Sequence, residues 1–448
     1  MRSRHFLPAV FVLLLILMVS FASFLAFGTP AGGTATSPAT GVDASKGSPV
    51  TNPEPQPSGF FGWSVATAPG NIGVVGEYNA TEGGFVGAGA AFTFIHQPNS
   101  TVYQLGLTLV SPNGRPGGNF GWSVAIGASA RVGNSSTPFR VVGAIAVGAP
   151  GETVDGMGGA GRVYVFNATT GRLISTLVSP EAQAGGGFGW SVTVSGSIVV
   201  VGAPNETENG IVGAGRAYSF NGESGLLIRT FASPNAQAGG HFGYSVGMSD
   251  NNVLNTSRVA VGAPGEAVGG VEEAGRAYVF GALSGGLIAQ LESPNVQQGG
   301  IFGCSVSVTL NITAVGAPGE ASAGLAQAGR AYGFWADTGG LLYNVSSPGA
   351  QQGGRFGWSV WLSEQTLAVG APGEAAAGLA GAGGAYTFSD MNGTLVKAYQ
   401  SRAASAGGAF GTAVSVVQGP VRFVGYILYV GAPREESSGN ESAGNAYA

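Results

Sequence analysis

The stretch Phe188-Gly189-Trp190-Ser191-Val192, followed by Val200-Val201-Gly202-Ala203-Pro204 and Gly213-Ala214-Gly215-Arg216-Ala217-Tyr218-Ser219-Phe220, decides the fold of this chain. Related stretches return 54 to 68 residues apart, with their Phe-Gly starts at Phe61, Phe120, Phe188, Phe242, Phe302, Phe356 and Phe410. A period of this size is typical of repeat folds built from one supersecondary unit.

Each repeat contains four short runs rich in β-branched and aromatic residues, which in the third copy are 188–194, 198–202, 216–220 and 226–231. Gly, Pro and Asn separate the runs, which predicts a four-stranded antiparallel sheet. One such sheet cannot bury both of its faces, whereas seven packed radially bury one another. We therefore predict an all-β seven-bladed β-propeller over residues 52–448, with blades starting near 60, 119, 187, 241, 301, 355 and 409.

Composition agrees with a single folded propeller. Glycine accounts for 81 of 448 residues, but the excess falls at repeated turn positions and not in a low-complexity tract. Charged residues make up 9% of the chain and the net charge is -5. The chain has no basic stripe to bind a phosphate backbone, so we expect no nucleic-acid partner.

The N-terminus predicts export. Arg2 and Arg4 precede an uncharged run over 6–27, and basic residues stay on the cytoplasmic side. We predict a hydrophobic helix within residues 1–28, serving as a signal peptide or as a membrane anchor, and a flexible Thr/Ala/Gly/Ser/Pro-rich spacer over 29–51. The propeller would then be extracellular or at the cell surface, and would touch the membrane only through the N-terminal segment.

Glycosylation acceptors support the same location. Asn-x-Ser/Thr triplets start at Asn79, Asn99, Asn134, Asn167, Asn205, Asn255, Asn311, Asn344, Asn392 and Asn440. This is more than the approximately three triplets that chance would give. Either the surface is glycosylated, which we favour, or Asn-Thr turns recur for structural reasons.

The repeated stretch resembles the FG-GAP repeat of the integrin α-subunit N-terminal propeller and of its prokaryotic relatives. The resemblance covers roughly residues 52–448, and seven copies in phase make it specific. It implies an exported seven-bladed module that acts in adhesion or ligand binding.

In that family, calcium is often held between the first two strands of a blade by an Asp-x-Asp-x-Asp-Gly run. Calcium requires six to eight oxygen ligands, but the corresponding hairpins here carry at most one acid each. We predict no metal and no other cofactor, with the loop at Asp250 as the least improbable exception.

Two repeats depart from the pattern. The first has Val75-Gly76-Glu77-Tyr78 in place of Gly-Ala-Pro, so we expect its turn to differ. The last stops at 444–448, inside its third strand. Either the N-terminal spacer supplies the missing one and a half strands or the chain is incomplete. We favour an incomplete chain or an imperfect, incomplete last blade, because 39–51 lack a β run.

The loops joining strands two to three and strands four to one emerge at the same end of the propeller, and that end gathers polar residues. The first set of loops carries Glu152, Glu206, Glu266, Glu320, Glu374 and Glu435, and the second carries Gln183, Gln237, Gln297 and Gln351. These residues predict a ligand-binding face. The alternative, which we favour, is structural pairing of the acids with Arg162, Arg216, Arg276 and Arg330.

Other repeated residues are more typical of packing. We expect Trp122, Trp190, Tyr244 and Trp358 to pack between blades, and Cys304, which replaces an aromatic in its repeat, to be a small buried hydrophobe. A Ser follows the aromatic position in six of the seven copies. A catalytic nucleophile is not repeated in this way, so we predict no catalytic residues and no enzyme activity.

The predicted function is that of an exported module that recognises an extracellular protein or glycan through the loops of one face. Two alternatives remain open: a carbohydrate-active enzyme that uses acids of the same face, and a purely structural envelope component.

Overall fold

The computed structural model describes residues 48–69, 72–96, 103–132, 140–249, 256–363, 365–418 and 426–448, which form seven four-stranded antiparallel sheets. The first four sheets are β2 (Ser64–Ala68), β3 (Ile72–Glu77), β4 (Ala90–His96), β5 (Tyr103–Val110); β6 (Ser123–Val132), β7 (Arg140–Ala149), β8 (Arg162–Asn167), β9 (Leu173–Leu177); β10 (Ser191–Ser195), β11 (Ile198–Ala203), β12 (Arg216–Asn221), β13 (Leu227–Phe231); and β14 (Ser245–Met248), β15 (Arg258–Ala263), β16 (Arg276–Gly281), β17 (Leu287–Glu292).

The remaining sheets follow in chain order, except that the seventh takes its outer strand from the start of the described chain. They are β18 (Ser305–Val308), β19 (Ile312–Ala317), β20 (Arg330–Trp335), β21 (Leu341–Val345); β22 (Ser359–Ser363), β23 (Thr366–Ala371), β24 (Gly384–Ser389), β25 (Leu395–Tyr399); and β26 (Ala413–Gln418), β27 (Tyr426–Ala432), β28 (Asn445–Tyr447), β1 (Pro49–Val50).

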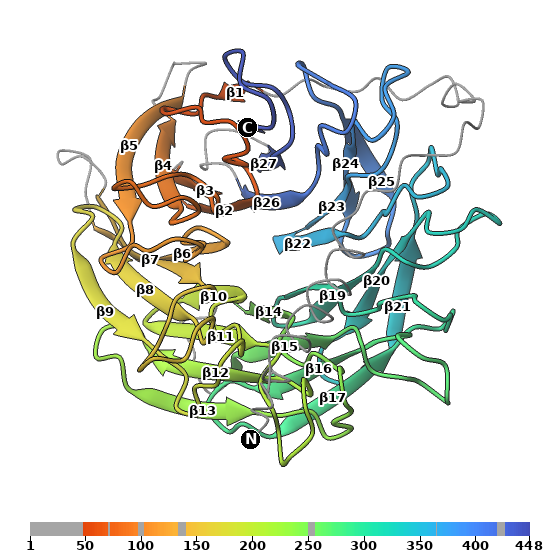
Figure 1. Cartoon of the computed structure of the whole chain (residues 1–448). Helices are drawn as coiled ribbons and strands as arrows, with labels where there is room; N and C mark the ends of the chain where they lie inside the picture. Colours follow the sequence, from red (N-terminus) through yellow and green to blue (C-terminus); the bar gives the residue numbers. More distant parts are fainter. Residues whose placement is uncertain are drawn as a thin grey trace, which may run out of the picture. The chain divides into compact units, whose positions relative to one another are not determined.

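The sheets are the blades of a seven-bladed propeller, as predicted. The first strands of successive blades, β2, β6, β10, β14, β18, β22 and β26, contact one another in turn, and β26 contacts β2. The first strands therefore form a closed inner ring, with the fourth strands on the outside (Figure 1).

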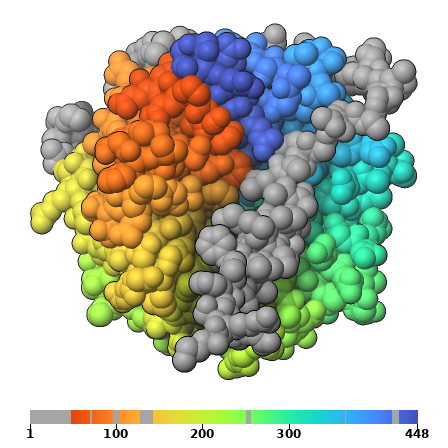
Figure 2. All heavy atoms as spheres, in the orientation of Figure 1, coloured from red at the N-terminus to blue at the C-terminus, as the bar shows by residue number. Residues whose placement is uncertain are grey.

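The seventh blade is complete, so the prediction of an incomplete last blade is wrong. Pro49 and Val50 pair antiparallel with Tyr447 and Ala446, and Ser48 exchanges backbone hydrogen bonds with Ala448. Figures 1 and 2 show the start of the described chain, in red, beside its end, in dark blue. The strand was missed because two residues, one of them proline, carry almost no periodic signal, and it lies in the predicted spacer.

The hydrophobic core is divided among the seven junctions between blades. Each cluster combines residues from two neighbouring blades, including the cluster that joins the seventh blade to the first. The seven Phe residues of the Phe-Gly pairs anchor these clusters, with 0 to 1% of their surface exposed. No blade buries its own faces, which is why the repeats stabilise one another.

The first strand of each blade starts later than the sequence pattern suggested. In the third blade β10 begins at Ser191, not at Phe188. Gly189 has a φ of 91°, a left-handed conformation that glycine adopts without strain. The chain therefore turns at the Phe-Gly pair. Trp190, which follows the pair, precedes the strand, so its side chain does not belong to the strand's alternating pattern.

Several predictions concern residues outside the described ranges. These are the hydrophobic helix within 1–28, the spacer up to residue 47, Asp250, and the glycosylation candidates Asn99, Asn134 and Asn255. Within the part of the chain that the structure describes, no helix has the length and apolarity needed to cross a bilayer.

Candidate functional site

The predicted acid ring does not face solvent. Exposure of Glu152, Glu206, Glu266, Glu320, Glu374 and Glu435 is between 0 and 3%. Each lies in the loop between the second and third strands of its blade and turns inwards. The carboxylates therefore do not form an open ring in the structure, and their part in ligand binding stays a prediction.

Each acid is instead held in a cluster that we call the acid clasp: the Glu, the Tyr of the third strand in the same blade, and a Ser from the loop that leaves the preceding blade. In the third blade the Tyr218 hydroxyl donates to Glu206 Oε2 at 2.5 Å, and Ser179 Oγ donates to the Tyr218 hydroxyl at 3.3 Å. The Tyr–Glu bond recurs at 2.5 Å in blades two to seven. The clasp therefore ties neighbouring blades together.

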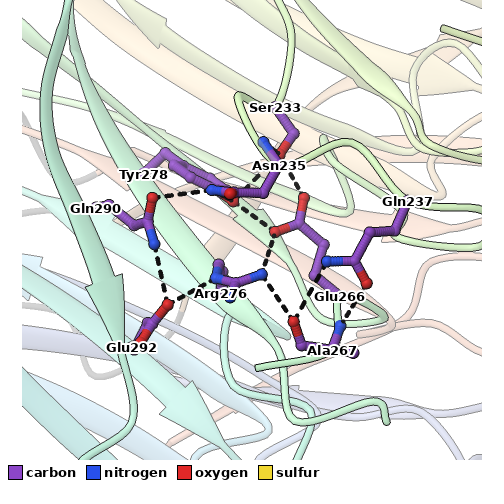
Figure 3. A network of polar contacts seen from close by, with 9 residues as sticks. All are labelled: Ser233, Asn235, Gln237, Glu266, Ala267, Arg276, Tyr278, Gln290 and Glu292. Carbon is purple, nitrogen blue, oxygen red and sulfur yellow. Dashed lines mark hydrogen bonds and ion pairs between the residues drawn. The ribbon is translucent and has the colours of Figure 1, made fainter. Parts of the chain in front are cut away.

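The fourth blade shows the fullest network (Figure 3). Ser233 and Tyr278 both donate to the carboxylate of Glu266. Arg276 contributes a more distant ion pair, with 3.5 Å between its Nη1 and Glu266 Oε2, and donates to Glu292 Oε1 at 2.7 Å. Both carboxylate oxygens of Glu266 therefore accept a hydrogen bond from a protein side chain.

The predicted Glu–Arg pairing is a secondary feature of these clusters. It is found at 3.7 Å for Arg162 with Glu152 and at 4.0 Å for Arg330 with Glu320. Arg216 pairs instead with Glu208 and Glu181. Tyrosine, which the sequence analysis did not consider, is the partner common to blades two to seven.

The four glutamines also have structural roles. Gln183 Oε1 accepts a hydrogen bond from the backbone N–H of Thr207 at 3.0 Å, and its Nε2 donates to the Thr207 carbonyl at 3.3 Å. Gln237, Gln297 and Gln351 bind the backbone of the equivalent loop residue. Each glutamine joins a loop between blades to the loop that carries the acid, so these side chains are already engaged within the fold.

The first blade reaches the same arrangement from a different sequence. Ala80 and Phe92 stand at the Glu and Tyr positions of the repeat, so neither residue can contribute to an acid clasp. Glu77, three residues upstream, is fully buried and accepts a hydrogen bond from Asn52 Nδ2 at 3.2 Å. Asn52 follows β1, so this contact joins the seventh blade to the first. Glu77 stands at the Ala position of Gly-Ala-Pro, so the departure of this repeat from the pattern supplies the buried acid of the first blade.

Burial raises the pKa of every one of these carboxyl groups. The pKa reaches about 8 for Glu77 and about 7 for both Glu206 and Glu374. The hydrogen bonds from Ser, Tyr or Asn lower the pKa, but less than desolvation raises it. The same burial raises the pKa of Tyr164 to about 12. Glu77, Glu206 and Glu374 are therefore partly neutral near pH 7, which lowers the cost of burying a carboxyl group at their blade junctions.

A second ring, at the centre of the propeller, has the geometry of a binding site. It consists of the residue after each Phe-Gly pair: Trp63, Trp122, Trp190, Tyr244, Cys304, Trp358 and Thr412. We call this ring the aromatic cup. It lines an open cavity of about 170 Å³. A cavity of this volume has room for several water molecules or for one small chemical group.

Four members of the cup form a continuous aromatic arc. Ring centroids are 5.0 Å apart between Trp63 and Trp122, 4.6 Å between Trp122 and Trp190, and 5.6 Å between Trp190 and Tyr244. Successive rings are tilted by 48 to 49°. All four side chains are half-buried. The predicted packing between blades is therefore confirmed for the arc, but these rings also line a cavity, which the sequence analysis did not propose.

The remaining side of the cup is less aromatic. Cys304 and Thr412 replace aromatic residues on either side of Trp358. Cys304 is 7% exposed, as expected for a small buried residue, and burial raises the pKa of its thiol to about 12. The guanidinium of Arg355 lies over the Trp358 ring, 5.6 Å from its centroid. The cup is therefore asymmetric, although its scaffold is a repeat.

The cup residues lie at the end of the propeller that was predicted to bind a ligand. These residues directly precede the first strands, so they lie at the same end as the loops between strands four and one. The cup therefore lies on the predicted ligand-binding face, but it is formed by other residues than the predicted Glu and Gln side chains.

The glycosylation candidates that the structure describes differ in accessibility. Asn311, Asn344 and Asn392 are exposed. On the cup face, the Asn79 amide donates to the Ser58 carbonyl at 2.9 Å and the Asn440 amide donates to the Pro55 carbonyl at 3.3 Å. Asn205 Oδ1 is buried, and Asn167 Oδ1 accepts bonds from Thr169 and Thr170. The exposed acceptors therefore lie away from the cup, and their use stays a prediction.

Metal binding gains no new candidate. Across the described ranges, no three His, Cys, Asp or Glu side chains gather in a way that could hold an ion. The expectation that the chain binds no calcium, which rests on the few acids in its hairpins, stays a prediction.

A model of the FG-GAP repeat family matches residues 172–220 and 345–388. Each matched segment runs from the outer edge of one blade to the third strand of the next, through β10–β12 and β22–β24 respectively. No curated protein matches the chain. Two segments of the chain thus match the FG-GAP repeat, and the seven blades are consistent with an integrin α-like N-terminal propeller.

Proposed function

We propose that these FG-GAP repeats build an exported binding module whose ligand enters the aromatic cup. The observation that carries the proposal is the cavity of about 170 Å³ at the centre of the ring, lined by one residue from each blade. Indole and phenol rings that are half-buried around a cavity can still bury apolar surface when a partner arrives. At the acid clasps, by contrast, the carboxyl groups are buried and each is bonded to a Tyr hydroxyl of its own blade.

The surroundings of the cup favour a partner that approaches from outside. Apolar side chains at the tips of the loops between strands two and three are exposed on the same face: Phe85 at 43%, Val212 at 66% and Leu379 at 36%. The exposed glycosylation candidates lie elsewhere on the blades. An extracellular protein or glycan could therefore approach the cup, while the membrane would be contacted only through the N-terminal segment.

The experiment is a binding screen with matched variants. The full propeller is tested against a panel of glycans and cell-surface extracts, with and without chelator, alongside Trp122→Ala and Trp190→Ala. A hot-spot aromatic contributes about 1.4 kcal/mol or more, so we expect each substitution to weaken retention at least about tenfold. Trp335→Ala is the control, because Trp335 ends β20 at 38% exposure, away from the cup.

If both cup variants retain the partner as well as the wild type does and keep its melting temperature, the cup is not the binding site. The chelator arm tests the calcium expectation separately, since loss of a bound ion would lower the melting temperature. Released sugar in the same assay would favour the carbohydrate-active alternative. That alternative and the structural one stay predictions.

A further inference from the structure

The loop between the second and third strands of the third blade carries a tight turn at its tip. Glu208 and Ile211 form an isolated antiparallel bridge, and their backbones exchange hydrogen bonds of 3.1 and 2.8 Å. The two residues between them, Asn209 and Gly210, have φ angles of 50° and 82°. Positive φ at both central residues is typical of a type I′ turn, which favours Asn-Gly. Both residues of this pair are exposed.

An Asn-Gly pair has the chemistry to modify itself. The backbone nitrogen of the glycine attacks the side-chain Cγ of the asparagine, a C–N bond forms, and the side-chain nitrogen leaves as ammonia. Water then opens the resulting five-membered imide to give Asp or isoAsp. The glycine nitrogen must lose its proton and reach Cγ. A nitrogen whose N–H donates to a carbonyl oxygen must first give up that hydrogen bond, which opposes the reaction.

The chain has four Asn-Gly pairs, which start at Asn113, Asn209, Asn221 and Asn392. In three of them the glycine N–H donates to a backbone carbonyl: Gly114 to Ser111 at 3.2 Å, Gly222 to Ser197 at 2.7 Å and Gly393 to Ser389 at 2.9 Å. The N–H of Gly210 has no hydrogen-bond partner among the described residues. The nucleophile of the reaction is therefore free at one pair and held at the other three.

The asparagine side chains differ in a similar way. Oδ1 of Asn221 and Oδ1 of Asn392 each accept the backbone N–H of the residue two positions further along, both at 3.0 Å. This local bond holds each side chain in one position. Within the described ranges, the Asn209 amide makes no hydrogen bond. Its Cγ can therefore turn towards the nitrogen of Gly210.

We infer that Asn209 is a self-modifying site, at which attack by the Gly210 nitrogen converts the asparagine to Asp or isoAsp. The Asp product fits the turn, because Asp155 stands at the equivalent position of the second blade with a φ of 48°. It adds a negative charge directly after Glu208, which is paired with Arg216. This inference does not depend on the cup being the binding site.

The isoAsp product has a larger effect on the loop. It adds a carbon to the backbone between Glu208 and Ile211, whose two hydrogen bonds require a loop of two ordinary residues. Val212, which is 66% exposed on the cup face, directly follows this bridge. The modification therefore alters both the charge and the shape of one loop tip on that face.

The test is peptide mapping by mass spectrometry after incubation of the folded full chain at mildly alkaline pH. Arg131, Arg216 and Arg355 lie between successive Asn-Gly pairs, so trypsin places each pair in a separate peptide. A parallel incubation in denaturant removes the turn geometry. Asn209→Gly is the control variant, because Gly269 at the equivalent position of the fourth blade has a φ of 59° and keeps the same turn.

We expect Asn209 to lose its amide at least about threefold faster than the other three asparagines in the folded chain, since no hydrogen bond on its glycine nitrogen has to break. In denaturant the four rates should converge, and Asn209→Gly should remove the mass change from its peptide. A folded chain in which Asn113, Asn221 or Asn392 reacts as fast as Asn209 would overturn the inference. So would a lead of Asn209 that persists undiminished in denaturant, or a mass change that survives Asn209→Gly.

Discussion

At the scale of single residues, burial raises the pKa of the repeated Glu above its ordinary value. Glu374 shows this most clearly, because Gly384 stands where other blades have Arg. It is 3% exposed, and its partners are the hydroxyl of Tyr386, at 2.5 Å, and the Ser347 side chain. Burial then raises its pKa to about 7 with no cation to oppose the shift.

The raised pKa predicts that stability falls as pH rises. Between the ordinary Glu pKa of 4.5 and the folded pKa of about 7, the folded chain holds a proton at Glu374 that the unfolded chain has lost. The free energy of unfolding therefore decreases across that window, by up to the order of 3 kcal/mol for one such group. Glu206 and Glu77 add to the trend, in the windows up to about 7 and about 8.

Glu374→Gln should flatten this dependence, because glutamine cannot lose a proton. We expect denaturant unfolding of the wild type to shift to lower denaturant concentration from pH 5 to pH 8, and the variant to shift less. Glu223→Gln is the control, since Glu223 is exposed. A wild-type protein that gains stability over the same range would show that the clasp acids are ionised in the fold.

At the scale of elements, neighbouring blades are joined by the Ser that starts most first strands. Ser191 Oγ donates to the Gly243 carbonyl of the next blade at 2.9 Å. The same bond is present in blades one to six. Blade seven has Ala413 at this position. Gly431 of the seventh blade lies against the Gly62 carbonyl, just as Gly202 of the third blade lies against the Gly243 carbonyl. The carbonyl acceptor is therefore present at the seventh junction, but the Ser hydroxyl that would donate to it is missing.

Two opposite substitutions follow from this difference. Ser191→Ala should lower the free energy of unfolding by about 1 kcal/mol, the typical net value of a hydrogen bond. Ala413→Ser should raise it by a similar amount by supplying the missing donor. Thermal unfolding of the two variants and their wild type would show the two shifts. If Ala413→Ser is destabilising, the seventh junction does not share the geometry of the other six.

Most of the blade architecture could be predicted from sequence, because the repeat supplies the strand pattern seven times. The clasp role of Glu206 could have been recognised from Tyr218, which keeps a fixed spacing of 12 residues from the acid in six blades. The cup was harder to predict. The sequence analysis placed Trp190 within the first strand, but β10 begins one residue later, at Ser191. Gly189, just before Trp190, has a left-handed φ, so the Trp190 side chain does not follow the alternation of the strand.

At the scale of the whole molecule, the ring is closed by strands from the two ends of the described chain. Val50 of β1 is 1% exposed and packs in the core between the seventh and first blades. Beyond β1, Asn52 donates to Glu77 of the first blade. Closure therefore depends on a two-residue strand, followed by a polar contact that corresponds to the acid clasp.

Val50→Asp should destabilise the protein by about 3 kcal/mol or more, because it places a charge in the closing core. Val396→Asp is the matched control, since Val396 lies on the outer strand β25 at 56% exposure. Chemical denaturation should separate the two variants clearly. Equal stability of Val50→Asp and Val396→Asp would mean that β1 does not close the ring in solution.

The cup itself is open to one direct observation, because the chain has six tryptophans in distinct surroundings. Trp63, Trp122, Trp190 and Trp358 line the cup, whereas Trp335 and Trp361 lie on β20 and β22. The measurement is the indole N–H spectrum of tryptophan-labelled protein during titration with the partner that the binding screen retains. The account predicts that the four cup indoles shift together while the other two do not. Shifts confined to Trp335 or Trp361, with the four cup resonances unmoved, would contradict it.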